Sequence, residues 1–214
     1  KCTALPQCQG SFFHKFFKIL PSGTVGGNLE SRELMQKRCG IIDIGTYTTD
    51  AIIHLGIKHI EGTEIVFGYG ISEAYNIVSS QLNGMPPKQI EDAYLERINP
   101  HIINRRYAIT WKQKEYKLSE IQEECERAFA IIAQKIAHLV MEKWNRPGKN
   151  QSDLLDSLLL CGGGAICTIE HFRKFVPNKV ELVENPQMSN VFGWMNRQLF
   201  IQQQAGKGQM VTRS

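Results

Sequence analysis

The chain has 214 residues, of which 42% are hydrophobic and 21% are charged. This composition excludes a disordered chain, because it supplies enough apolar side chains for a buried core. The net charge is only +4, and lysine and arginine are spread along the chain, which argues against direct nucleic-acid binding. No apolar run is long enough to cross a bilayer, so we expect no membrane contact.

The cysteines show no metal-binding pattern. They form no Cys-x-x-Cys pair, no cluster of histidines lies beside them, and several fall in apolar or helical stretches. We therefore expect buried free thiols in a reducing compartment and a cytoplasmic protein. The six are Cys2, Cys8, Cys39, Cys125, Cys161 and Cys167.

The first notable segment is the aromatic run from Phe12 to Ile19, with four phenylalanines among eight residues. Two interpretations are open: a severed element of a preceding domain, or a docking arm. If it were exposed, it would be an aggregation risk.

Residues 40–55 predict a hairpin. Two Ile-rich β-branched runs flank a polar turn, Gly-Thr-Tyr-Thr, with Asp43 at the end of the first run and Asp50 after the turn. Backbone N–H groups and hydroxyls in such a turn suit phosphate oxygens, and Asp43 suits magnesium held through water. From this segment alone, an ordinary buried hairpin with satisfied turn carboxylates is an equally good interpretation.

The middle of the chain predicts a third strand, two helices and a second hairpin. Residues 57–67 indicate the strand, with a break near residues 61–63. Apolar spacing predicts a helix over 71–83 with Ser72 as its N-cap. A shorter helix over 86–98 and a hairpin over 102–116 follow.

A long helix is predicted over residues 119–144, where apolar residues recur every three or four positions. Ser119 to Gln122 reads as a capping box at its start.

The last third alternates strands and helices. The apolar run of residues 157–161 predicts a buried strand that ends in three consecutive glycines, and glycine lets backbone approach a flat ligand. A helix over 167–175, a strand over 179–183 and a helix over 188–203 follow. This alternation implies a partly parallel sheet covered on both faces.

The turn after Asp43 (Asp-Ile-Gly-x-x-Thr-Thr-Asp) and the glycines at 162–164, in this order with a long helix between them, resemble the second phosphate motif and the adenosine motif of the actin, heat-shock chaperone and sugar kinase superfamily. The resemblance is strongest to bacterial actin-like ATPases of the plasmid-segregation ParM type. Residues 186–193 are similar to the start of that family's last helix, and a Leu-Pro segment lies upstream. The resemblance runs from about Ile19 to about Gln203.

This resemblance implies an α/β fold: an actin-like (ribonuclease H-like) second domain, with a three-stranded antiparallel meander followed by alternating helices and strands in a mixed sheet. No first phosphate loop precedes Asp43, so we expect half of a two-domain protein. Residues 1–38 would be a remnant of the first domain or a linker. Residues 39–203 would form the domain, with an insertion at about 85–117, and 204–214 a disordered tail.

The resemblance also implies site residues. Asp43 would be catalytic and would orient magnesium-bound water, whereas Asp50 is read as structural. In relatives an acidic or amide residue after a proline positions the attacking water, and the segment Leu20-Pro21-Ser22 places a serine there. Glu126 and Arg127 would contact the base or ribose, although a solvated helix face is an equally good interpretation. Phosphate contacts would come from Gly45, Thr46, Tyr47 and Thr48, and adenosine contacts from Gly162, Gly163 and Gly164.

Three functions remain open. The first is an actin-like ATPase that binds ATP or ADP with Mg, forms ATP-dependent filaments for plasmid or DNA segregation, and partners with copies of itself and a DNA-binding adaptor. By this interpretation the chain alone is inactive until a first domain completes it. The second is a non-hydrolysing interaction module with a decayed site. The third is a small-molecule kinase of the same superfamily, with its substrate base in another domain.

Overall fold

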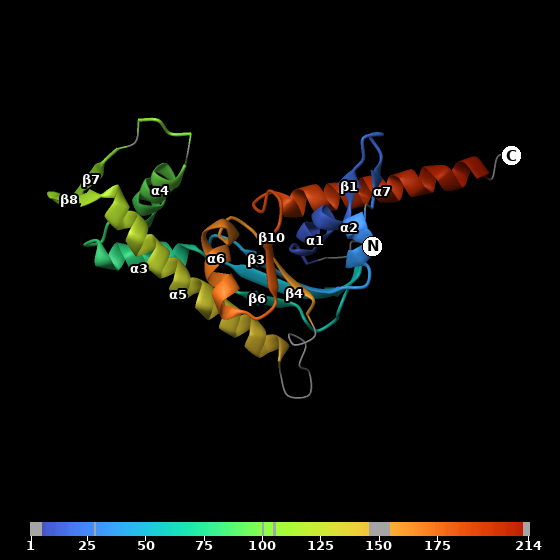
Figure 1. Cartoon of the computed structure of the whole chain (residues 1–214), viewed down its shortest axis with the longest axis horizontal. Helices are drawn as coiled ribbons and strands as arrows, with labels where there is room; N and C mark the ends of the chain where they lie inside the picture. Colours follow the sequence, from blue (N-terminus) through green and yellow to red (C-terminus); the bar gives the residue numbers. More distant parts are fainter. Residues whose placement is uncertain (1–5, 28, 100, 105, 146–154, 212–214) are drawn as a thin grey trace.

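A mixed six-stranded sheet with helices on both faces forms the centre of the molecule (Figure 1). The computed structural model describes residues 6–27, 29–99, 101–104, 106–145 and 155–211. The strand order is β10, β9, β3, β4, β5, and β6 pairs with the other end of β4. This arrangement confirms the predicted α/β fold class with a mixed sheet.

The predicted hairpin forms the antiparallel half of the sheet. Strand β3 (Arg38–Ile44) pairs with β4 (Thr49–Leu55), and Asp43 lies directly opposite Asp50. The predicted third strand is divided as expected into β5 (Lys58–His59) and β6 (Ile65–Phe67), both antiparallel to β4.

The parallel half of the sheet comes from the end of the chain. Strand β9 (Ser157–Cys161) lies parallel to β3, and β10 (Lys179–Leu182) lies parallel to β9. Asp43 and Cys161 are register partners, so the ends of β3 and β9 meet at one edge. The polar turn after β3 and the glycines after β9 therefore emerge side by side.

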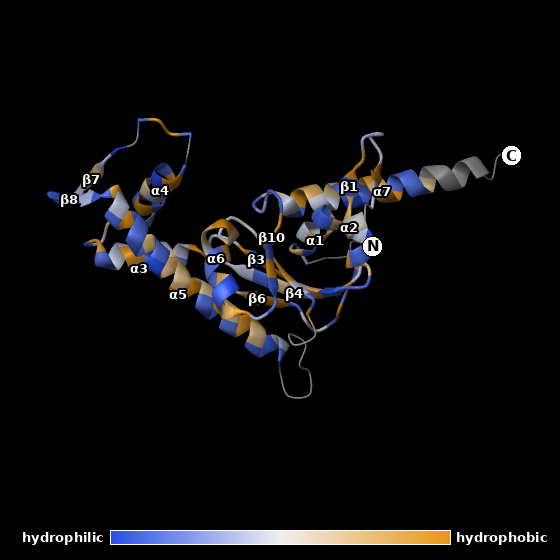
Figure 2. Cartoon of the chain, viewed as in Figure 1, coloured by the Kyte–Doolittle hydropathy of each residue, from blue (hydrophilic) through white to orange (hydrophobic). Residues whose placement is uncertain are grey.

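Three helices cover one face of the sheet: α3 (Ser72–Gln81), α5 (Leu118–Trp144) and α6 (Ala165–Phe175). Their apolar stripes pack on alternate residues of the strands, such as Ile42, Ile44 and Leu160, in one aliphatic and aromatic core. Figure 2 shows hydrophobic and hydrophilic residues recurring along α5, the longest helix of this layer. Helix α4 (Pro87–Ile98) and the hairpin of β7 (Ala108–Trp111) and β8 (Lys114–Lys117) extend this layer at one end (Figure 1).

The opposite face is covered by α1 (Gln9–Phe16), α2 (Leu29–Leu34) and α7 (Ser189–Val211), with the short hairpin of β1 (Lys18–Ile19) and β2 (Val25–Gly26) beside them. Residues of α1 and α2 thus pack on the same sheet as the rest of the chain, and the assignment of residues 1–38 to a remnant or linker stays a prediction. The four phenylalanines of the aromatic run are each at most 8% exposed, because this face of the sheet offers them a second core. They are Phe12, Phe13, Phe16 and Phe17.

Helices α1 and α7 cross at a pair of glycines. A Cβ atom on Gly193 would lie 1.6 Å from the backbone oxygen of Gly10, and one on Gly10 would lie 2.3 Å from the backbone oxygen of Asn190. Real side chains cannot occupy such distances, so glycine is required for the two backbones to touch.

Several helix ends differ from the prediction, and two of them have a clear physical reason. Helix α5 begins at Leu118, where the Lys117 N–H donates to the Glu120 carboxylate at 3.2 Å, so the cap lies two residues before the predicted Ser119. Helix α7 continues to Val211, where the sequence predicts a disordered tail from residue 204. The residues from Gln202 to Ala205 are good helix formers, so the backbone continues a helix that packing has already started.

None of the helices in the described ranges is long and apolar enough to cross a membrane. Five of the cysteines have free thiols, as predicted; four are buried and Cys167 is partly buried.

Candidate nucleotide site

Asp43 lies at the end of β3 and is only 7% exposed. Burial raises the pKa of its carboxyl group above the ordinary value, because water no longer solvates the charge; a hydrogen bond from Asn190 lowers that pKa, and the nearby Asp50 raises it. The Asn190 Nδ2 donates to Asp43 Oδ2 at 2.6 Å. A buried carboxylate thus stands at the edge where the two strands meet.

The turn after Asp43 is oriented by the start of α3. The backbone oxygens of Gly45 and Thr46 accept hydrogen bonds from the N–H groups of Ile71 at 3.0 Å and Ser72 at 2.9 Å. These carbonyls cap α3, so the predicted N-cap side chain is replaced by backbone: Ser72 is the first helical residue.

The outer side of this turn is open. Residues 46–48 are exposed, and the Gly45 N–H donates to the Thr48 oxygen at 2.9 Å to close the turn. The Tyr47 side chain is 75% exposed, so its ring points away from the turn. The bulk of this tyrosine therefore does not fill the space beside Asp43.

The glycine turn packs directly against Asp43. Gly162 has φ +84°, and a Cβ atom there would lie 2.3 Å from Asp43 Oδ1. The Gly164 N–H donates to the Ile44 oxygen at 2.9 Å, and a Cβ atom on Gly164 would lie 2.6 Å from the Ile44 side chain. Both positions therefore require glycine, while Gly163 is exposed. The structure brings the two predicted turns into contact.

Glu126 and Arg127 are placed differently from the two turns. Glu126 accepts a hydrogen bond from the Tyr94 hydroxyl at 2.9 Å and faces His171 Nε2 at 3.4 Å, so it joins α5 to α4 and α6. Arg127 is bonded to Glu124 on the same helix. Both side chains already have protein partners.

The predicted water-positioning segment lies elsewhere. Ser22 is at the exposed tip of the β1–β2 hairpin, where its hydroxyl meets that of Thr24 at 2.8 Å. The assignment of Ser22 is therefore wrong, because the segment forms a surface turn. A second proline segment, Pro6-Gln7, immediately precedes α1. The first turn of α1 adjoins the site, since the Ser11 N–H donates to Asn190 Oδ1 and Asn190 in turn donates to Asp43.

The sequence indicates no role for Asn190 or Ser11. Asn190 lies in the segment 186–193, whose pattern predicts only the start of a helix. Ser11 lies on α1, far from Asp43 in the sequence. The contacts of Asn190 with Ser11 and with Asp43 join residues 179 and 147 positions apart, and such distances leave no local spacing pattern in the sequence.

The donor set suits a metal that keeps most of its water. Among the residues that the structure describes, no group of three or more His, Cys, Asp or Glu side chains could hold a metal ion. Magnesium in nucleotide sites is typically held by one or two carboxylates, phosphates and water. One buried carboxylate beside an exposed hydroxyl-rich turn fits that pattern, and it does not fit zinc or a protein-caged ion.

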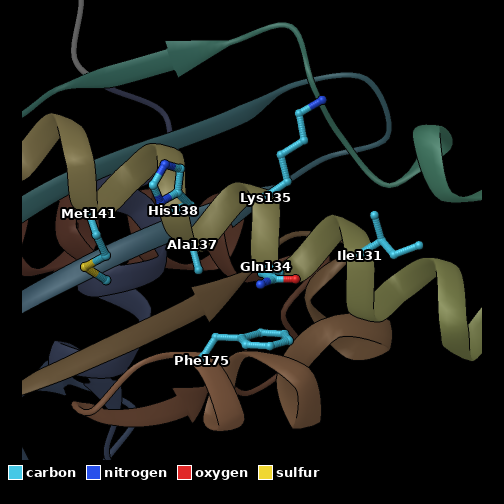
Figure 3. Close-up of a pocket in the computed structure, with 7 residues that line it drawn as sticks. All are labelled: Ile131, Gln134, Lys135, Ala137, His138, Met141 and Phe175. Atoms are coloured by element: carbon cyan, nitrogen blue, oxygen red, sulfur yellow. The ribbon is translucent and has the colours of Figure 1, made fainter.

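A separate cavity of about 560 Å³ lies between α5 and α6 (Figure 3). Phe175 of α6 faces the α5 side chains across it, and none of the predicted site residues lines it. Its lining residues are Ile131, Gln134, Lys135, Ala137, His138, Met141 and Phe175.

The family model described as "Archaeal actin homologue MreB-like, C-terminal" matches residues 41–174, which is more than half of the chain. The chain therefore belongs to this family of actin homologues. The more particular ParM type is not established by this match. A search of curated protein sequences finds no match.

Solved structures of actin-like proteins share the fold. The actin-like protein Alp7A is 12% identical, with a TM-score of 0.69 over 95% of this chain and 55% of that chain. A ParM filament structure from Clostridium botulinum is 19% identical, with a TM-score of 0.64 over 92% and 53%. The archaeal actin homologue Ta0583 in complex with ADP is 16% identical, with a TM-score of 0.62 over 89% and 55%. The chain spans about half the length of these proteins.

Proposed function

We propose that this chain is the nucleotide-binding half of an actin-like ATPase, which binds ATP or ADP with magnesium. The observation that carries the proposal is the contact between the Asp43 turn and the glycine turn at one edge of the sheet. Ligands of open α/β sheets bind outside the carboxyl ends of the strands, and β3 and β9 both end at this edge. The ADP complex of the archaeal homologue supports the same ligand class.

The two turns would bind different parts of the nucleotide. Thr46, Tyr47 and Thr48 would bind phosphate oxygens through hydroxyl and backbone N–H groups, and Gly45 keeps their turn tight. Asp43 would orient water on the magnesium ion, and magnesium supplies charge neutralisation for the phosphates. Gly162, Gly163 and Gly164 would present the glycine turn to the adenosine: Gly163 is exposed, whereas Gly162 and Gly164 pack that turn against Asp43 and Ile44. Glu126 and Arg127 would approach the base or ribose only by exchanging their present partners.

Hydrolysis would require a group that positions the attacking water. Gln7 is exposed, follows Pro6 and precedes α1, the helix whose Ser11 contacts Asn190 beside Asp43, so we propose its amide in preference to Ser22. Phosphoryl transfer depends mainly on such positioning and on electrostatic stabilisation. We propose turnover only when a first domain closes the other side of the cleft.

We propose that the complete protein self-associates into filaments, as the ParM relative does. Plasmid or DNA segregation through a DNA-binding adaptor, and a cytoplasmic location, belong to the same proposal.

A second candidate is a non-hydrolysing interaction module that keeps the fold. The observation in its favour is that Glu126 and Arg127, two of the expected nucleotide contacts, are held by other protein side chains. A kinase function has no comparable support within the described residues.

The two candidates are separated by calorimetric titration of the chain with ATP and magnesium. Asp43→Asn is the test variant, and Asp50→Asn is its matched control, because the two carboxylates face each other across the hairpin. We expect weak magnesium-dependent binding that Asp43→Asn abolishes and Asp50→Asn leaves. Equal loss in both variants, or binding that is unchanged by Asp43→Asn, would contradict the proposed site.

A further inference from the structure

Asp43 is held from two sides. Its Oδ2 accepts the short hydrogen bond from Asn190, and its Oδ1 faces the α-carbon of Gly162 so closely that no side chain fits there. A carboxylate that must orient a metal-bound water needs a fixed rotation about its own side-chain bonds. Of these two neighbours, Asn190 is the one that makes a directional bond.

The orientation of the Asn190 amide is itself determined. The Ser11 backbone N–H lies 3.0 Å from Asn190 Oδ1, and a backbone N–H can only donate. The amide oxygen must therefore face Ser11, and the NH2 group must face Asp43. The Ser11 hydroxyl donates to the same oxygen at 2.7 Å and meets the Ser189 hydroxyl at 2.6 Å.

The helix crossing brings these groups within reach. Gly10 and Gly193 let α1 and α7 touch through their backbones, which puts Ser11 of α1 beside Ser189 and Asn190 of α7. Ser11 and Ser189 are both fully buried. The series Ser11, Asn190, Asp43 therefore runs from one helix, through a second helix, to the end of β3.

We infer that Asn190, oriented by Ser11, is the positioning residue that holds Asp43 in its metal-orienting conformation. This inference rests on the proposed function. It adds Asn190 and Ser11 to the proposed site. A displacement of α1 against α7 would change the hydrogen bond that Asn190 donates to Asp43.

The test is an NMR titration of the Asp43 side-chain carboxyl group in the full chain without nucleotide. Asn190→Asp places a second carboxylate against the first, so we expect the pKa of Asp43 to rise by more than about one unit. Asn190→Ala removes the donor and gives a smaller rise. Ser11→Ala keeps the backbone N–H that donates to Asn190, so we expect the smallest rise in the pKa of Asp43. If Asn190→Asp does not fold, Asn190→Ala and Ser11→Ala still test the inference.

The matched control is Asn196→Ala. Asn196 lies on the same helix, is 4% exposed, and donates to the Phe17 oxygen at 3.0 Å instead of to a carboxylate. We expect no change in the pKa of Asp43 in this variant. An unchanged pKa in the Asn190 variants, or an equal change in Asn196→Ala, would overturn the inference.

A second readout keeps the inference separate from the proposed function. The affinity of the wild-type chain for ATP is measured once with magnesium and once in excess chelator, and the difference is the magnesium-dependent part. Asn190→Asp should weaken the magnesium-dependent part by about tenfold or more and leave the chelator value unchanged. Wild-type chain that binds no nucleotide would contradict the proposed function, whereas the titration of Asp43 would still decide the role of Asn190.

Discussion

The two faces of the sheet are built differently. The face under α3, α5 and α6 is an aliphatic and aromatic core, with Phe129 between the rings of Tyr75 and Tyr94. The face under α1 and α7 also buries polar groups, among them His54, Asn196, Ser11 and Asp43, the last two joined through the partly buried Asn190. Apolar packing stabilises without direction, whereas hydrogen bonds fix positions. We conclude that the first face mainly supplies stability and the second mainly positions the site.

The largest expected effect comes from the apolar face. Phe129 is fully buried and makes edge contacts with Tyr75 and Tyr94 at 5.7 and 5.0 Å between ring centroids. Phe129→Ala should lower the free energy of unfolding by about 4 kcal/mol, because it leaves a cavity. Chemical denaturation measures this value. Phe175→Ala, at a 41% exposed position, is the control and should cost far less.

The α1–α7 crossing comes next. Gly193→Ala forces a methyl group into the backbone of Gly10, so the helices must separate, at a cost of about 3 kcal/mol. Because separation also pulls Asn190 from Asp43, the pKa of Asp43 should rise in this variant and not in Phe129→Ala. The control is Gly68→Ala, where nothing lies within 4 Å of the added carbon. A Gly193→Ala variant with wild-type stability and an unchanged pKa of Asp43 would contradict the close crossing of α1 and α7.

The third prediction concerns His54, whose side chain is fully buried and stacks on Phe12 at 4.6 Å between ring centroids. Neither ring nitrogen has a hydrogen-bond partner among the described residues. Burial first, and the charge of His59 second, lower the pKa of His54 to about 4 from 6.5. Below pH 6.5 His54 binds a proton in the unfolded chain but stays neutral in the folded chain. The stability contribution of His54 is therefore fully present above pH 6.5 and is lost as the pH falls toward 4.

The total loss from this histidine is about 3 kcal/mol. Unfolding by denaturant at several pH values measures it as the difference between wild type and His54→Phe, since other groups titrate in both. The variant should keep the stacking on Phe12 and lack this part of the pH dependence. Parallel pH profiles for the two proteins would show that His54 is not held neutral.

The smallest effect is expected at the solvated end of the molecule. Arg106 pairs with Glu96, and the hydrogen bonds from Arg106 lower the pKa of Glu96. Because the arginine side chain is 55% exposed, Arg106→Gln should cost less than about 1 kcal/mol, and added salt should reduce even this difference. Thermal unfolding at low and high salt measures it. A loss as large as that from Gly193→Ala would mean that the pair is structurally central.

The sequence predicted the elements whose signal is local. Strand β9 was predicted with its observed limits, and α4, α5 and β10 to within one residue at each end, because apolar periodicity and turn residues lie within each segment. The break between β5 and β6 was also predicted, from Gly62 and its neighbours.

Features that depend on distant contacts were missed. The four phenylalanines of the aromatic run carry no sign of which surface covers them, so their burial against the sheet was not foreseen. Ser22 was predicted to position the attacking water because it follows Leu20-Pro21, but the same short sequence also suits the tip of a hairpin. Asn190 reaches Asp43 from 147 residues away, and no spacing rule connects them. Both candidate turns could be predicted because each is a contiguous sequence motif. Asn190 could not, because its role depends on contacts with residues far away in the sequence.

The most direct measurement is a two-dimensional amide NMR titration of the chain with Mg·ATP at millimolar concentration, which detects weak binding and locates it. We predict that the signals of residues 45–48 and 162–164 shift together, that excess chelator reverses most of the shift, and that residues lining the α5–α6 cavity stay unchanged. Shifts confined to that cavity, or none at the two turns at saturating nucleotide, would contradict a nucleotide site at this edge of the sheet.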